Sequence, residues 1–141
     1  SRQTSIFGFK CLCRKIITSI LKNEETIDVW GDGEQTRSFL YIDDCVEATL
    51  KLFDSDKHGP INIGSEEKVS INQMIDKIEI ISKKKVKRHY QLEKPKGVRG
   101  RNSDNTLIRS SLNWEPKFSL YQGLEKTYDW ILEEIKKKHN Q

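Results

Sequence analysis

Residues 30–53 read WGDGEQTRSFLYIDDCVEATLKLF, and the hydrophobic pattern changes twice along this stretch. A β-rich run, IDVW, ends at a Gly-Asp-Gly turn over residues 31–33, and TRSFLYI then alternates as extended chain does. We expect Asp43 or Asp44 to cap the helix that follows, with Glu47 near its third position. A strand, a turn, a second extended segment and a helix in this order indicate an α/β fold.

The same alternation continues on both sides of this stretch. Apolar spacing predicts helices at 8–22, at 71–82 behind a Ser70 cap, at 104–112, and from a Ser119–Gln122 capping box to near the end of the chain. Short strands are expected at 61–64 and 86–90. The segment 93–103 has prolines and glycines but no periodicity, so it is predicted to be a loop. We therefore expect mixed helices and short strands, with no internal repeat or linker.

Composition fits a packed domain. Of the 141 residues, 35% are hydrophobic and 33% are charged, so a core is feasible and disorder is not indicated. The net charge of +4 is mild. Lysine runs at 83–85 and 136–138 fall where helices should end, where cations complement the helix dipole. No aromatic platform interleaves with them, so we expect no nucleic-acid partner.

Cysteine, histidine and apolar patterns exclude several other classes. Cys11, Cys13 and Cys45 have neither zinc nor redox spacing, and the three histidines are scattered, so no metal site is expected. Three cysteines cannot all pair within one chain, which favours a reducing compartment. Without a bilayer-length apolar run or a signal-peptide core, we expect a cytoplasmic protein with no membrane partner.

No catalytic set stands out in the sequence. The glycines at 31–33 and 97–100 do not make the G-x-G-x-x-G of a dinucleotide site, which needs a strand-to-helix junction. Tyr90 and Lys94 have the Tyr-x-x-x-Lys spacing of redox enzymes, but Pro95 disfavours a helix at residue 94. We regard this spacing as accidental and assign no catalytic residue.

What remains is a set of cations on irregular backbone. Arg37 follows the Gly-Asp-Gly turn, Arg99 and Arg101 lie in the glycine-rich stretch GVRGRNSDN of residues 97–105, and Lys15 lies on the first helix. Guanidinium groups match phosphate oxygens two at a time, and glycines let backbone approach a ligand closely. The pattern indicates an anion site with Asn102 and Ser103 reaching hydroxyl groups. A solvated loop whose arginines pair with Asp104 or Asp32 is an equal alternative.

Three stretches resemble a known family: WGDGEQTRSFLYIDDCVEATLKLF, then PINIGS, then GVRGRNSDNTLIRSSLNWEP. Together they resemble the C-terminal, substrate-binding part of extended short-chain dehydrogenase/reductases, the NAD-dependent, Rossmann-type epimerases and dehydratases. QTRSF and GVRGRNSDN are narrower and are most similar to GDP-mannose 3,5-epimerases. The similarity runs from about Cys13 to about Ile135, and residues 1–9 form an atypical N-terminal segment.

The resemblance implies roles for individual residues. Gln35, Thr36 and Arg37 would contact the nucleotide sugar, with Arg37 on the diphosphate. Arg101 would be a second diphosphate ligand, and Lys15 in the CRK match at 13–15 would contact substrate. Cys13 and Cys45 would be small core residues. Asp104 would either orient the Arg101 side chain or cap the helix that follows.

The resemblance also implies what lies elsewhere. The family's NAD fingerprint, catalytic Tyr and Lys, and acid–base Cys precede the matching region, so NAD would be bound by an N-terminal half that residues 1–141 do not include. The whole protein would be an isomerase acting on GDP-mannose through a transient 4-keto intermediate, and a homodimer; the chain alone would be inactive. The alternatives are another nucleotide-sugar epimerase, dehydratase or decarboxylase, and a non-catalytic chain that binds nucleotide sugars or a protein. The helix at 43–53 would pack on the cofactor domain and expose Val46, Leu50 and Phe53.

Overall fold

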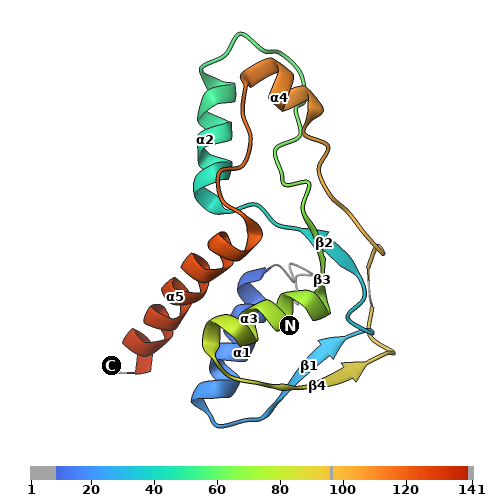
Figure 1. Ribbon diagram of the computed structural model, residues 1–141, viewed down its shortest axis with the longest axis vertical. Coiled ribbons are helices and arrows are strands. Elements are labelled where there is room, and N and C mark those ends of the chain that lie inside the picture. Colours follow the sequence, from blue (N-terminus) through green and yellow to red (C-terminus); the bar gives the residue numbers. More distant parts are fainter. Residues whose placement is uncertain (1–8, 96, 140–141) are drawn as a thin grey trace.

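The computed structural model describes residues 9–95 and 97–139, and its elements form an upper and a lower lobe (Figure 1). The predicted atypical segment 1–9 lies outside the described residues, except for the backbone of Phe9. The lower lobe contains α1 (Phe9–Leu21), β1 (Thr26–Trp30), α3 (Ile71–Ser82) and β4 (Lys87–Gln91). The upper lobe contains α2 (Ile42–Phe53) and α4 (Thr106–Leu112). Between the lobes lie β2 (Thr36–Ser38), β3 (Lys68–Ser70) and the start of α5 (Leu120–His139).

The described strands form two small sheets. β1 and β4 pair in parallel, with Ile27 opposite Arg88, although they are separated by four other elements of the chain. β2 and β3 pair antiparallel, with Arg37 opposite Val69. Helices α1, α3 and α5 pack against one another beside the parallel pair. This mixture of helices and short strands is the expected α/β fold.

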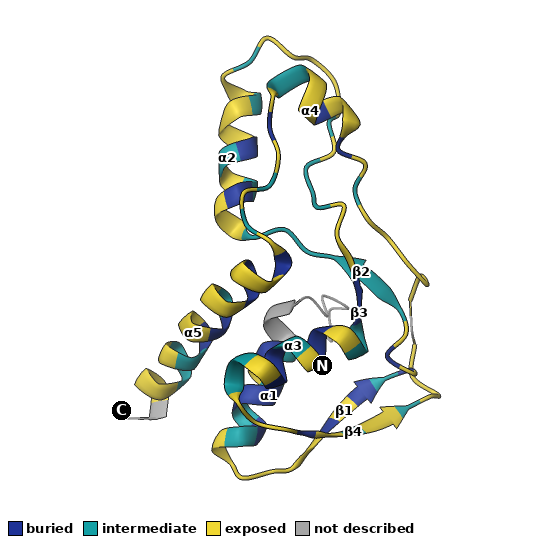
Figure 2. Ribbon diagram, viewed as in Figure 1, coloured by how far each residue is buried: buried dark blue, intermediate teal, exposed yellow. Residues whose placement is uncertain are grey.

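The main core lies in the lower lobe, as the dark blue segments of Figure 2 show. Its buried side chains come from α1, both sheets, α3 and α5: Cys13, Ile16, Ile17, Ile27, Val29, Val69, Met74, Ile75, Ile78, Val86, Leu120, Leu124, Tyr128 and Ile131. A second, smaller cluster in the upper lobe consists of Ala48, Ile108 and Trp114. The chain is therefore held by one large core and a small satellite.

The predicted Ser70 cap and the predicted Ser119–Gln122 capping box are confirmed, and the Ser70 cap is also a capping box. Ser70 Oγ accepts a hydrogen bond from Gln73 N at 3.1 Å, and Ser70 N donates to Gln73 Oε1 at 2.9 Å. The same reciprocal pair starts α5, where Gln122 N donates to Ser119 Oγ at 3.3 Å and Ser119 N donates to Gln122 Oε1 at 3.0 Å. Each pair satisfies backbone donors that the first helical turn leaves without partners.

The predicted cap of α2 is wrong. The helix begins at Ile42, and its N-cap is Tyr41, which makes no side-chain capping bond. Asp44 is buried at 1% exposure and accepts hydrogen bonds from Lys117 N and Phe118 N, both at 3.0 Å. Local spacing predicted that this carboxylate caps α2, but it accepts hydrogen bonds from backbone amides that lie before α5. Glu47 pairs instead with Lys51 and Lys117.

The strand expected at 61–64 is also wrong, because these residues have no strand pairing in the described structure. Ile61 and Ile63 pack in part against the upper cluster. The strand that does form is β3, whose three residues were not predicted, because only pairing with β2 defines it. The strand expected at 86–90 is confirmed as β4, and TRSFLYI is strand only as far as Ser38.

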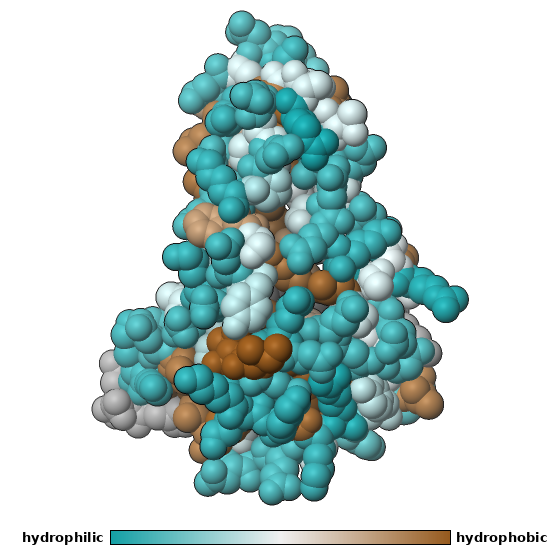
Figure 3. Space-filling model, viewed as in Figure 1, coloured by the Kyte–Doolittle hydropathy of each residue, from teal (hydrophilic) through white to brown (hydrophobic). Residues whose placement is uncertain are grey.

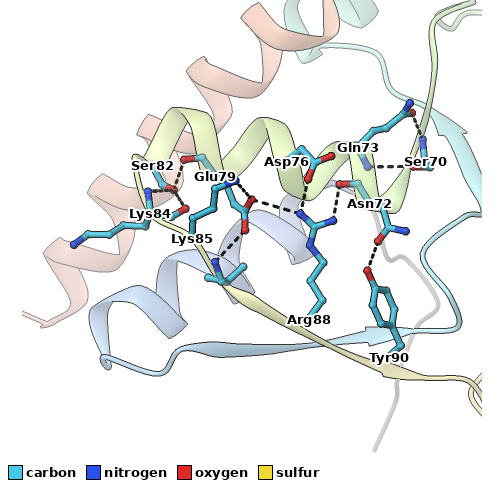
Figure 4. Close-up of polar contacts among 11 residues, drawn as sticks. Ser70, Asn72, Gln73, Asp76, Glu79, Ser82, Lys84, Lys85, Arg88 and Tyr90 are labelled. Atoms are coloured by element: carbon cyan, nitrogen blue, oxygen red, sulfur yellow. Dashed lines mark hydrogen bonds and ion pairs between the residues drawn. The ribbon is translucent and has the colours of Figure 1, made fainter.

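A buried carboxylate joins α3 to the start of β4 (Figure 4). Glu79 is 5% exposed and accepts hydrogen bonds from Val86 N and Lys85 Nζ, both at 3.0 Å. Arg88 adds an ion pair to Glu79 at 3.4 Å and bonds to Asp76. Burial lowers the pKa of Arg88, but the bonds to Asp76 and the charge of Glu79 outweigh that effect and raise it. The guanidinium therefore stays charged and keeps β4 against α3.

The outer face of α2 is apolar and exposed. Val46 is 47% exposed, Leu50 57% and Phe53 84%, which confirms the expected exposure of these three side chains. Figure 2 shows this side of α2 in yellow, and Figure 3 shows apolar surface at the same outer edge. Val46, Leu50 and Phe53 lie three and four positions apart on one face of the helix, and adjacent exposed apolar side chains favour association with another surface.

Residues 1–141 in isolation are predicted to self-associate through the outer face of α2. Leu50→Lys and Phe53→Ser should each lower the association measured by sedimentation velocity, because they remove exposed apolar area from this face. Ile80→Ser is the matched control, since the exposure of Ile80, 63%, lies between those of Leu50 and Phe53 but Ile80 is on α3. A monomer that melts cooperatively would contradict the prediction.

Candidate functional site

The candidate site forms where β2 lies beside the segment 97–103. Thr36 N donates to Arg99 O at 2.9 Å, and Thr36 and Gly100 form a parallel bridge. A Cβ atom on Gly100 would lie 2.6 Å from Thr36 Oγ1, so a side chain at residue 100 would force Thr36 or the loop to shift. Arg37 and Arg101 are the next residues after the two bridge partners, and the pairing brings their segments together across more than 60 positions of sequence.

Arg37 has a structural contact within the site. Its Nη1 donates to Thr36 O and to Val98 O, both at 2.7 Å. Its Nη2 lies 3.3 Å from where a Cβ atom on Gly97 would be, and Gly97 has a φ of +68° that favours glycine. The guanidinium therefore helps to hold the loop that carries Arg101, in addition to placing a positive charge there.

The far end of the same loop is fixed to the segment before β3. Ser103 N donates to Ser65 O at 3.2 Å. Asn105, which is 1% exposed, donates from Nδ2 to Gly64 O at 2.9 Å and from N to Glu66 Oε1 at 3.0 Å. Hydrogen bonds therefore hold the loop at both ends, so that its arginines project from an ordered backbone.

A polar pocket of about 370 Å³ is lined by residues that directly follow the two arginines in the chain, and neither arginine lines it. Ser38 follows Arg37 directly and Asn102 follows Arg101, and both line this pocket. The remaining lining residues are Leu40, Asn62, Ile63, Gly64, Ser65 and Ser103. Hydroxyl and amide groups of this kind both donate and accept hydrogen bonds, as the hydroxyls of a sugar require.

Four of the five predicted binding residues lie in or beside this junction. Thr36, Arg37 and Arg101 are described above. Gln35 lies in the turn before β2, where its Nε2 donates to Trp30 O at 3.0 Å and its Oε1 is buried without a hydrogen-bond partner among the described residues. Lys15 lies on α1, which the pairing of β2 with the loop does not involve.

Asp104 lies at the start of the next helix and Cys13 lies in the core, as the resemblance implied. Asp104 Oδ1 accepts a hydrogen bond from Thr106 N at 2.9 Å, at the first residue of α4. The bonds from Thr106 lower the pKa of Asp104, so its carboxylate stays charged at the start of this helix. Cys13 is fully buried, and desolvation raises its pKa to about 12, so it is a neutral core residue. Cys45 is only partly buried.

Sequence patterns did not identify Ser38, Asn62 or Ser65. Asn62 lies in the segment 61–64, where a strand was expected and none is formed. The two serines have no spacing that marks a site. Among the described residues, no group of His, Cys, Asp and Glu side chains could hold a metal ion. No helix in the described part of the chain is long and apolar enough to cross a membrane.

Comparisons with known proteins show extensive similarity. A family model described as GDP-mannose 4,6 dehydratase matches residues 2–127. GDP-mannose 3,5-epimerase of Arabidopsis thaliana is 48% identical over 126 residues, which cover 89% of this chain and 32% of that protein. UDP-glucuronate 4-epimerase of Thermodesulfobacterium geofontis is 36% identical over 113 residues, covering 79% of this chain and 35% of that protein. The chain thus spans about a third of the length of these relatives.

The fold is also that of solved nucleotide-sugar enzymes. A crystal structure of UDP-glucuronic acid 4-epimerase from Bacillus cereus, in complex with UDP-glucuronic acid and NAD, superposes with a TM-score of 0.77 at 32% identity. The superposition covers 94% of this chain and 41% of that one. The α/β architecture is therefore that of NAD-dependent epimerases and dehydratases of the extended short-chain dehydrogenase/reductase type.

Gly100→Ala is predicted to separate the loop from β2. The added methyl group would meet Thr36 Oγ1 at 2.6 Å, so the Thr36 amide should lose its bond to Arg99 O. Loss of one such bond corresponds to about 0.5–1.5 kcal/mol, which should appear as faster hydrogen exchange in residues 33–38. Thr36→Ala in the Gly100→Ala background removes the clashing oxygen and should restore slow exchange. Unchanged exchange in Gly100→Ala would show that the close approach is not required.

Proposed function

We propose that this chain, which belongs to the GDP-mannose 4,6 dehydratase family, binds the diphosphate of a nucleotide sugar where β2 meets the segment 97–103. One observation carries the proposal: the Thr36–Gly100 bridge aligns the segments that bear Arg37 and Arg101. A guanidinium presents a planar fork of donors that matches phosphate oxygens in pairs. Two such groups on an ordered backbone suit a diphosphate better than a single isolated anion.

The remaining predicted ligands extend this proposal. Thr36 lies beside Arg37 in β2, and Gln35 directly precedes that strand. Lys15, on α1, would add a further cation. The polar pocket lined by Ser38, Asn62 and Asn102 would receive hydroxyl groups of a sugar attached to the diphosphate. The chain would thereby hold the substrate in one orientation, which lowers the entropic cost of the chemical steps.

For the whole protein we propose an NAD-dependent GDP-mannose 3,5-epimerase. The Gly31–Gly33 turn does not have the geometry of a dinucleotide fingerprint, because β1 leads through it into β2 and not into a helix. A dinucleotide site needs the N-terminus of a helix at that junction to receive the pyrophosphate. In the proposed enzyme, NAD and the redox and proton-transfer groups are therefore supplied by residues outside this chain, and residues 1–141 contribute substrate binding.

A related enzyme that acts on a UDP-sugar is the second candidate, since solved structures at 32–33% identity are of UDP-glucuronic acid 4-epimerase. The 48% identity to the GDP-mannose enzyme, against 36% to a UDP-glucuronate enzyme, favours a guanine nucleotide. Thermal shifts of the full-length protein that contains this chain distinguish the candidates. GDP-mannose should raise the melting temperature more than UDP-glucuronate at equal concentration. The reverse order would favour the second candidate, and no shift with either would favour a non-catalytic role.

Arg101→Ala is predicted to weaken GDP binding to the full-length protein by ~1.5–3 kcal/mol, the range for hydrogen bonds to charged groups. Its melting temperature should not change, because Arg101 is exposed. Arg37→Ala should weaken binding by at least as much, since it also removes the bond to Val98 O. Titration calorimetry with GDP measures both effects.

Arg109→Ala is the matched control for these substitutions. Arg109 is an exposed arginine on α4 that pairs with Glu66 and Glu115, and surface pairs of this kind contribute little to stability. It should leave GDP affinity unchanged. Equal loss of affinity in Arg101→Ala and Arg109→Ala would show that the effect is one of general charge and not of a diphosphate site.

A further inference from the structure

Asn72 connects α3 to the turn that precedes Arg37. Asn72 lies in the first turn of α3, and its Nδ2 donates to Asp32 O at 3.1 Å and to Glu34 Oε1 at 2.6 Å. Its backbone N donates to Gly33 O at 3.0 Å. One residue therefore bonds to three successive residues of the turn between β1 and β2.

The other side of the same amide is held by β4 (Figure 4). Tyr90 OH donates to Asn72 Oδ1 at 2.9 Å, and Arg88 Nη1 donates to Asn72 O at 3.3 Å. The partners of Nδ2 are acceptors and the partner of Oδ1 is a donor, so the orientation of the amide is determined. Aspartate could not donate to the turn, and an apolar residue could neither donate nor accept.

Gly33 shows how closely the Asn72 amide approaches the turn. Gly33 has a φ of +75°, and a Cβ atom on it would lie 2.3 Å from Asn72 Oδ1. The amide therefore occupies the space where a side chain at residue 33 would be. The chain leaves this turn directly into Gln35, Thr36 and Arg37, and Thr36 then bonds to Arg99 O.

We infer that Asn72 is a positioning residue for the diphosphate site. It acts through the 31–34 turn, whose position sets that of Arg37 and, through the Thr36–Gly100 bridge, that of Arg101. This inference rests on the proposed function, because the site that Asn72 positions is the proposed one. Asn72 itself contacts the turn and β4, so its effect on ligand is indirect.

Asn72→Asp in the full-length protein tests this inference. The substitution keeps the size of the side chain, an acceptor for Tyr90 and the backbone bond to Gly33 O. It removes the two Nδ2 hydrogen bonds to Asp32 O and Glu34 Oε1, and it places a carboxylate beside Glu34. Hydrogen exchange in residues 31–37 should become faster by about five- to tenfold, the change that corresponds to loss of a hydrogen bond. Affinity for GDP should fall by a similar factor, whereas affinity for guanosine, which has no phosphate, should be unchanged.

Two variants make the result specific. Tyr90→Phe removes the bond to Oδ1, together with the contact of the Tyr90 hydroxyl with Arg88, but keeps both Nδ2 bonds to the turn. It should show a smaller change in the same direction, so it serves as the milder variant if Asn72→Asp folds poorly. Ile81→Ala is the matched control, because Ile81 packs against the core near the other end of α3. It should lower the melting temperature and leave the ratio of GDP to guanosine affinity as in the wild-type protein.

The possible outcomes separate this inference from the proposed function. Wild-type protein that binds GDP no more tightly than guanosine overturns the proposed function, and the inference with it. Wild-type protein that prefers GDP, together with Asn72→Asp and Tyr90→Phe variants that keep both this preference and slow exchange, overturns the inference alone. Equal losses of GDP and guanosine affinity in Asn72→Asp and Ile81→Ala would show that Asn72 has only a general structural role.

Discussion

The pairing of Thr36 with Arg99 and Gly100 holds together two segments that are more than 60 positions apart in the chain. Arg37 lies on one segment, and Arg99 and Arg101 lie on the other. The hydrogen bond from Arg37 to Val98 O joins the same two segments a second time. The pairing therefore gathers cationic side chains at one junction, and such an arrangement suits an anionic ligand.

Local signals predicted those parts of the fold that local hydrogen bonds define. The capping boxes of Ser70 and Ser119 need residues only three positions apart, and both are present. Asp44 had an equally good local signal for a helix cap. Its carboxylate instead accepts hydrogen bonds from backbone amides more than 70 positions away, and it does not cap α2. Strand β3 exists only through pairing with β2. Partners that are distant in sequence leave no periodic trace, and this explains each of these errors.

The same distinction applies to the candidate site. Residue type and glycine content indicated Arg37, Arg99, Arg101 and Lys15, and the resemblance added Gln35 and Thr36 as ligands. Asn72 lies in the helix predicted at 71–82, and no sequence pattern distinguishes it from the other polar residues of that helix. Its inferred role rests on hydrogen bonds to the 31–34 turn and from Tyr90 of β4, and both of these lie outside α3. Sequence could therefore indicate candidate cations for a ligand, but not the neutral side chain that we infer to position them.

The two sides of the candidate site differ in how firmly they are held. The 31–37 side is bonded to α3 and β4, which belong to the large core. The Asn62–Ser65 side runs down from the upper lobe, whose buried apolar cluster consists, among the described residues, of Ala48, Ile108 and Trp114 and whose helix α2 exposes an apolar face. The two hydrogen bonds of Asp44 join α2 to the segment before α5 and do not reach residues 62–65. Covering α2 would therefore order the polar pocket more than the arginine side. Under the proposed function, binding of sugar hydroxyls would depend on that contact more than binding of the diphosphate would.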